Sequence, residues 1–295
     1  MRLSIALIAF AAAHAQPPKQ PNFSTEVRLV RLLVNVKNQA GELIGTLNKD
    51  EFTVFDNGVK QDVAVFEHYT TKPLSVSVMV DTSGSTAKDW PLEVKSLSRF
   101  LRALFGSGNE HDTAALYTFN YDTTLQHDFT RNSKSLEGML RAIKPEGGTS
   151  LYDAIFHSAR DLQPRDGRHV MVIVSDGGNT TSSKTFKDAR EAAQRADAVI
   201  YPIVIVPISN DAGRNIGGEH ALQILASDTG GRWFDPTLAE LDRTFEEILR
   251  DLRAQYMLGY YPKEQSKGFH PVRVDLARKD LRAQTRTGYY GDAFP

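Results

Sequence analysis

Three polar clusters in the sequence carry only oxygen donors. Asp81, Ser83 and Ser85 come directly after the apolar run LSVSVMV. Thr149 lies in the glycine-rich stretch GGTSLYD, and Asp176 lies in SDG after the apolar run HVMVIV. Hard cations such as Mg²⁺ prefer oxygen ligands and often keep some water, so two carboxylates and three hydroxyls suit Mg²⁺, with Mn²⁺ or Ca²⁺ as alternatives. The pattern predicts a metal site, provided that the fold brings the clusters together.

The segment 74–253 contains the elements that would position these clusters. Strand-like runs that are apolar throughout alternate with amphipathic helical patterns over this range. This alternation predicts a mostly parallel sheet with helices on both faces, which is a doubly wound, Rossmann-like α/β domain. Ligands bind at the carboxyl ends of the strands in such sheets, near the point where strand order reverses. We therefore expect the three clusters to meet at one edge of the sheet.

The predicted helices cover residues 91–105, 133–143, 150–162, 184–196 and 237–253. The last one begins with a capping box formed by Thr237 and Glu240. The polar stretch 208–220 is expected to be a loop.

Four further polar residues could lie near the clusters in the fold. Asp153 is expected to serve the first turn of its helix, and Ser150 to be a helix N-cap, because both residue types are favoured there. Tyr121 lies with Asp122 in a turn between two strands. The two residues form either an exposed hairpin tip or a surface that influences partner choice.

The segments that flank the α/β domain, 24–70 and 254–295, are both strand-like. In the first, Asn57-Gly58 separates two alternating runs, which is a strong hairpin signal. Two or three strands cannot bury a face alone. We therefore expect the two segments to form one small β-sandwich-like domain into which the α/β domain is inserted.

Residues 1–15 have the pattern of a secretory signal peptide. A basic Arg2 precedes an apolar stretch that ends in the small-x-small sequence Ala13-His14-Ala15. The apolar stretch is shorter than the roughly 20 residues that a membrane-spanning helix needs. After it comes a proline-rich lead at 16–23. We expect cleavage near Ala15 and a mature chain that is exported to the periplasm or the outside, without membrane insertion.

Composition argues against several classes of protein. The formal net charge of −1 lacks the basic excess of a nucleic-acid binder. The chain has no cysteine, which excludes disulfides and thiolate metal ligands. Its 8 histidines show no zinc-binding spacing. Partners are therefore expected to be selected by a local site and not by overall charge.

The order DTSGS, GGTSLYDA and VSDG resembles the metal-ion-dependent adhesion site of von Willebrand factor A domains. The resemblance implies that the hydroxyls of Ser83, Ser85 and Thr149 face the metal, and that Asp81 and Asp176 bind it directly or through water. The flanking segments are similar to those of exported bacterial proteins called VWFA-related.

The resemblance implies a non-catalytic adhesion module. A bound divalent cation would capture an Asp or Glu side chain of a partner protein, and the last helix, 237–253, would be able to slide when the metal shell changes. Two alternatives stay open at this point: a metal-dependent hydrolase acting on phosphate or acyl groups, and an envelope assembly factor with a purely structural metal.

Overall fold

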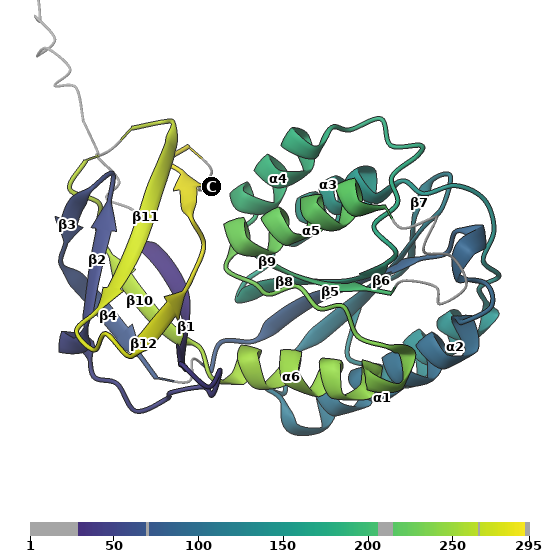
Figure 1. The fold of residues 1–295 in the computed structure, drawn as a ribbon, viewed down its shortest axis with the longest axis horizontal. Coiled ribbons are helices and arrows are strands. Elements are labelled where there is room, and N and C mark those ends of the chain that lie inside the picture. The colour runs from purple at the N-terminus through teal and green to yellow at the C-terminus, as the bar shows by residue number, and fades with distance from the viewer. Residues whose placement is uncertain (1–28, 69–70, 206–214, 265, 293–295) are drawn as a thin grey trace, which may run out of the picture.

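The computed structural model describes residues 29–68, 71–205, 215–264 and 266–292. Within them, a central sheet with helices on both faces stands beside a pair of antiparallel sheets (Figure 1). The predicted signal peptide and proline-rich lead lie outside the described residues. No helix in the described part of the chain is long and apolar enough to cross a membrane.

The central sheet has the strand order β7-β6-β5-β8-β9. Its strands are β5 (Leu74–Asp81), β6 (Thr113–Phe119), β7 (Thr123–Thr130), β8 (Arg168–Ser175) and β9 (Ala198–Val204). All neighbouring pairs are parallel except β6 and β7, which are antiparallel. The chain runs outward from β5 to β7 on one side and from β8 to β9 on the other. Strand order therefore reverses at β5, which is where ligands bind in doubly wound sheets.

Helices cover the two faces of this sheet separately (Figure 1). One face packs against α1 (Trp90–Ser107), α2 (Ser133–Ala142) and α6 (Leu241–Arg253). The other face packs against α3 (Leu151–Leu162), α4 (Phe186–Arg195) and α5 (Ile216–Thr229). The strands β5, β8 and β9 are buried along their whole length, as expected for a sheet covered on both faces. The predicted doubly wound α/β fold is confirmed.

The two antiparallel sheets each combine strands from both ends of the described chain. Their orders are β12-β1-β10-β4 and β13-β11-β2-β3. The N-terminal strands are β1 (Val30–Asn38), β2 (Phe52–Asp56), β3 (Val59–Gln61) and β4 (Val63–Glu67). The C-terminal strands are β10 (Tyr256–Tyr260), β11 (Phe269–Leu276), β12 (Leu281–Gln284) and β13 (Gly288–Tyr290). One hydrophobic core joins residues of both sheets, so the prediction that the two segments fold together is confirmed.

Local predictions agree with the structure except in one stretch. Asn57 and Gly58 both have positive φ and connect β2 to β3, which confirms the predicted hairpin. Thr237 and Glu240 form the expected capping box, although a short 3₁₀ turn at Leu238–Glu240 precedes α6. Of the predicted loop 208–220, residues 208–214 lie outside the described residues. The prediction is wrong at its end, because α5 already begins at Ile216 with Asn215 as its N-cap.

Candidate metal centre

The predicted ligands lie at the carboxyl ends of adjacent strands. Asp81 is the last residue of β5, and Asp176 directly follows β8, whose last residue is Ser175. Because β5 and β8 are parallel neighbours, both strand ends face the same edge of the sheet. Asp81 is completely buried, Ser83 is nearly so, and Ser85 is exposed. The cluster therefore has a buried floor and an open side.

Hydrogen bonds connect four of the five predicted ligands. Asp81 Oδ1 accepts from the backbone N–H of Ser83 at 2.9 Å. The hydroxyls of Ser83 and Ser85 lie 3.0 Å apart, and Ser85 Oγ donates to Asp176 Oδ2 at 2.7 Å. On the buried side, Ser175 Oγ donates to Asp81 Oδ2 at 2.8 Å. Ser175 was not predicted as a site residue, because nothing local shows that its hydroxyl reaches a carboxylate on the neighbouring strand.

Thr149 joins the cluster through its loop. Its carbonyl accepts from the N–H groups of Thr180 and Thr181, at 2.8 and 3.1 Å, which fixes it beside the loop that follows Asp176. A Cβ on Gly178 would lie 3.0 Å from Asp176 Oδ1 and 3.4 Å from Thr149 Oγ1, so both oxygens border the same space. The structure thus brings all five predicted residues together.

The loop that follows β5 and the glycine-rich loop of Thr149 are also joined by hydrogen bonds. The N–H of Gly84 donates to the carbonyl of Gly147 at 3.2 Å, and the N–H of Glu146 donates to the carbonyl of Thr82 at 2.7 Å. These backbone hydrogen bonds fix the positions of the loops, and they leave the side-chain oxygen atoms of the predicted ligands available to a metal. The arrangement is preorganised before any ligand arrives.

Negative charge accumulates at this edge of the sheet. Burial raises the pKa of Asp81 to about 6, against the opposing effect of hydrogen bonds from Ser83 and Ser175, and the nearby charge of Asp176 adds to the rise. Glu93 on α1 is 2% exposed, and burial followed by repulsion from Asp81, Asp89 and Asp176 raises its pKa to about 8.

Glu93 was missed by sequence reasoning. Its Oε2 has no hydrogen-bond partner within the described residues, and its side chain lines a small cavity together with Ser85, Asp89 and Asp176. The available signal was its position four residues before Leu97, which places a carboxylate on the apolar stripe of α1. Among the ion pairs of the described residues, none involves Asp81, Asp89, Glu93 or Asp176.

The donor set fits a hard cation. Oxygen atoms from three loops border one space, and none of the described Lys, Arg or His side chains forms an ion pair with these carboxylates. No group of three His, Cys, Asp or Glu side chains able to hold a metal occurs in the described part of the chain. A metal here would therefore rely on hydroxyl ligands beside its two carboxylates, which suits Mg²⁺ better than zinc.

A family comparison agrees with this fold and site position. The model of the von Willebrand factor type A domain matches residues 76–248. The chain belongs to the von Willebrand factor type A domain family. The matched range contains the whole central sheet except the first two residues of β5, and every residue of the cluster. No curated protein matches the chain.

Solved structures show the same type A domain fold at low sequence identity. The type V pilus tip protein Mfa5 of Porphyromonas gingivalis is similar over 61% of this chain and 95% of its von Willebrand domain, with 16% identity and a TM-score of 0.51. Proximal thread matrix protein 1 of the mussel byssus is similar over 67% of this chain and 49% of its own, with 17% identity and a TM-score of 0.52. An aerotolerance-related membrane protein of Bacteroides fragilis shares 19% identity over 61% of this chain and 98% of its own, with a TM-score of 0.48.

Asp153 and Ser150, the two helix-start residues near the metal cluster, lie in the first turn and at the N-cap of α3. Asp153 lies in the first turn of α3, as expected, and it also accepts from the backbone N–H groups of Ser183 and Lys184 at 2.9 and 2.7 Å. Ser150 occupies the N-cap position, but its hydroxyl makes no capping bond. Ser182 Oγ instead accepts from the N–H groups of Tyr152 and Asp153 at 3.0 and 3.3 Å.

Tyr121 and Asp122 lie in the β6–β7 turn. Asp122 is exposed. Tyr121 is 63% exposed, yet its ring lies against the glycine loop of Thr149, because a Cβ on Gly147 or Gly148 would meet that ring. The turn is thus placed at the rim of the cluster and does not project freely into solvent.

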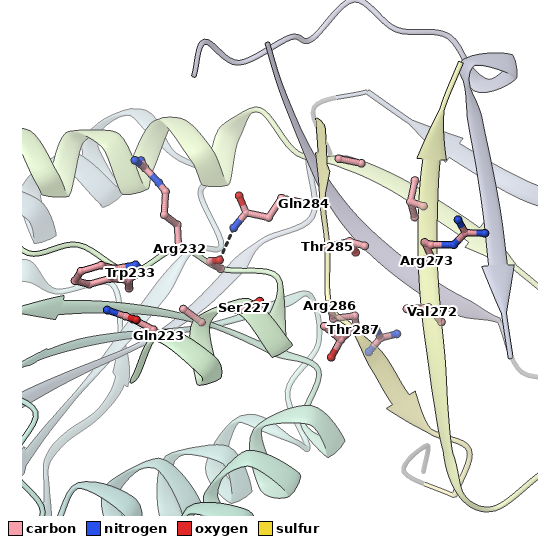
Figure 2. A pocket seen from close by; sticks show the side chains of 14 residues that line it. Gln223, Ser227, Arg232, Trp233, Val272, Arg273, Gln284, Thr285, Arg286 and Thr287 are labelled. Carbon is pink, nitrogen blue, oxygen red and sulfur yellow. Dashed lines mark hydrogen bonds between the residues drawn. The ribbon is translucent and has the colours of Figure 1, made fainter. Parts of the chain in front are cut away.

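A second concave site lies between the type A domain and the antiparallel sheets. This pocket of about 420 Å³ is lined by residues of α5, of the segment after it, of β11 and β12, and of the segment 285–287 that precedes β13 (Figure 2). Figure 2 shows the guanidinium groups of Arg232 and Arg273 pointing away from the gap, and each pairs with carboxylates, Arg232 with Glu247 and Arg273 with Asp275. The pocket contains none of the predicted ligands.

Proposed function

We propose that this chain is an exported, non-catalytic binding protein whose type A domain captures an acidic side chain of a partner protein through a bound divalent cation. The observation that carries the proposal is the hydrogen-bonded set of oxygen atoms on three loops, with carboxylates that form no ion pair within the part of the chain that the structure describes. Asp81, Ser83, Ser85, Thr149 and Asp176 would hold the ion. When bound, the ion would supply a positive centre able to accept an incoming carboxylate.

Mg²⁺ is the proposed ion, with Mn²⁺ and Ca²⁺ as alternatives, because the donors are all oxygen and several are uncharged. The two carboxylates together neutralise a divalent ion, and the hydroxyls add ligands without adding charge. The exposed position of Ser85 leaves the cluster open to the surface. An acidic side chain can therefore approach from that side.

A non-catalytic role is supported by the residues that surround the cluster. A hydrolase needs a nucleophile or general base that reaches the reacting atoms. Asp153 is engaged by the N–H groups of Ser183 and Lys184, and Glu93 is buried beneath the cluster. Turnover of generic phosphate or ester substrates that disappears in Asp81→Ala would contradict the proposal.

The type A domain fold accords with a binding role. Among the similar structures, one is the von Willebrand domain of a pilus tip protein and another is a thread matrix protein. Neither likeness identifies a partner for this chain. Export is proposed from the N-terminal sequence pattern at residues 1–15.

Calorimetric titration with Mg²⁺ tests the site. Wild type is expected to bind Mg²⁺, and Asp81→Ala and Thr149→Ala to lose binding. Asp166→Asn is the matched control, because Asp166 is an exposed aspartate just before β8, at the opposite end of that strand. Equal Mg²⁺ affinity in wild type and both site variants would contradict the assignment of these residues as metal ligands.

An affinity pull-down from the native envelope tests the function. Capture of a partner in Mg²⁺ is expected to fail in EDTA and in Asp81→Ala, and to persist in Asp166→Asn. Capture that is unaffected by EDTA would rule out the metal-bridged mechanism.

A further inference from the structure

Tyr121 presents an exposed aromatic surface beside the metal cluster. Its ring is held from below by the glycine loop, since a Cβ on Gly148 would lie 3.2 Å from the ring, and Gly147 approaches it even more closely. Its backbone carbonyl accepts from Thr181 Oγ1 at 3.0 Å. The residue is thus fixed at two points while 63% of its surface stays exposed.

Ile216 is a second exposed apolar residue near the cluster. It is 73% exposed and opens α5. The same helical turn touches the loop of Asp176, because a Cβ on Gly218 would overlap the carbonyl oxygen of Gly177. The loops of Thr149 and Asp176 are therefore each accompanied by one large exposed apolar side chain. We call Tyr121 and Ile216 the apolar rim.

Exposed apolar side chains at a polar site suggest what lies beside the bound carboxylate. Tyrosine is enriched at binding hot spots because it contributes a large contact area at small entropic cost. In an extended peptide, side chains two residues apart point to the same face at a spacing of roughly 7 Å. A peptide that directs an acidic side chain at the metal therefore directs the side chains two residues before and after it toward the same surface.

We propose that the partner presents an extended segment in which the metal-bound Asp or Glu has a bulky apolar residue two positions away, and that Tyr121 receives this apolar side chain, with Ile216 as a second contact. The inference rests on the proposed function, because the acidic side chain needs the cation. It adds the chemical class of the partner segment, which the metal site alone does not define. Tyr121 is then a specificity-determining residue and not a metal ligand.

Three synthetic peptides test the proposal. The first has one Asp with Phe two positions to either side, the second replaces both Phe residues with Gly, and the third replaces the Asp with Asn. Binding is measured by fluorescence polarisation in Mg²⁺ and in EDTA. Wild type is expected to bind the Phe peptide at least about tenfold more tightly than the Gly peptide, and the Asn peptide not at all.

Variants assign the preference to the rim. Tyr121→Ala is expected to bind both Asp peptides with similar affinity, and Ile216→Ser to reduce the preference in part. Tyr261→Ala is the matched control, because Tyr261 is a tyrosine with 51% exposure directly after β10. Unchanged Mg²⁺ affinity in Tyr121→Ala, and in a milder Tyr121→Leu variant, shows that the metal site is intact.

The outcomes separate this inference from the proposed function. If the Asp peptides bind only in Mg²⁺ but with equal affinity, or if the preference survives in Tyr121→Ala, the rim proposal is wrong and the metal-bridged function stands. If no Asp peptide binds in Mg²⁺, the proposed function fails and the rim proposal fails with it.

Discussion

Glu93 carries a buried carboxyl group whose Oε2 has no hydrogen-bond partner within the described residues. Isolated buried charges are costly, so such a group stays protonated unless a cation lies nearby. Burial, followed by repulsion from Asp81, Asp89 and Asp176, raises its pKa to about 8. Ionised Glu93 would destabilise the metal-free protein, and a cation bound at the cluster would offset this cost. The burial of Glu93 is therefore consistent with a cation site.

Glu93 should make the metal-free protein less stable as pH rises. Its pKa is about 8 in the folded state, against an ordinary glutamate pKa of 4.5. Between these values the folded state holds a proton that the unfolded state has lost, so stability is full at low pH and falls as pH rises toward 8. The expected slope is about 1.4 kcal/mol per pH unit from this group. Urea unfolding in EDTA between pH 6 and 8 measures it.

Glu93→Gln should remove that slope, because glutamine mimics the protonated acid at every pH. The matched control is Glu246→Gln, which changes an exposed glutamate on α6 and should leave the slope as in wild type. Parallel pH profiles in wild type and Glu93→Gln would show that the carboxyl group is not held protonated by the fold.

At the scale of elements, α5 positions the loop that carries Asp176. Gly218 in its first turn touches Gly177, and a Cβ there would overlap the Gly177 carbonyl oxygen. Gly218→Ala should therefore displace the loop, lower Mg²⁺ affinity by about tenfold, or about 1.4 kcal/mol, and cost about 1–3 kcal/mol of stability through overpacking. Calorimetric titration and thermal melting measure the two effects.

The adjacent glycine is a control of the same chemical change. Among the described residues, the atom nearest to a Cβ on Gly217 would be Asn215 Oδ1 at 3.7 Å. Gly217→Ala should therefore keep Mg²⁺ affinity and melting temperature close to wild type, since alanine favours helix more than glycine does. Equal loss of Mg²⁺ affinity in both variants would contradict the idea that the Gly177 contact positions the loop.

These elements also show what the sequence can and cannot predict. The buried strands, the helices and the order of the polar clusters are encoded in local patterns, so they were predictable. The start of α5 was not, because Ile216-Gly217-Gly218 reads as loop and Gly218 is explained by a contact with Gly177, about forty positions away. The bond from Ser175 to Asp81 and the packing of Tyr121 on Gly147 were hidden for the same reason.

At the scale of the whole molecule, α6 joins the type A domain to the antiparallel sheets. Its Asp251 pairs with Lys37 of β1 at 3.1 Å and with Arg232 at 3.3 Å, and it is almost fully buried. Further contacts join the two parts at α5, where the N–H of Thr287 donates to the carbonyl of Asp228 at 3.0 Å. Any shift of α6 would have to alter the Lys37 pairing.

The antiparallel sheets should form only when both ends of the chain are present. β10 lies between β1 and β4 in one sheet, and β11 lies between β13 and β2 in the other. A chain that ends at Arg253 would leave β1, β2 and β4 without these partners and would expose the apolar residues Leu32, Val34 and Val54. Two or three unpaired strands are not stable alone.

Limited proteolysis of this truncated chain, followed by mass spectrometry, should therefore find rapid cleavage within 29–68 and slow cleavage within 74–205. Equal protection of 29–68 in the truncated and full chains would contradict the shared fold of the two ends, because the N-terminal strands would then be stable without the C-terminal ones.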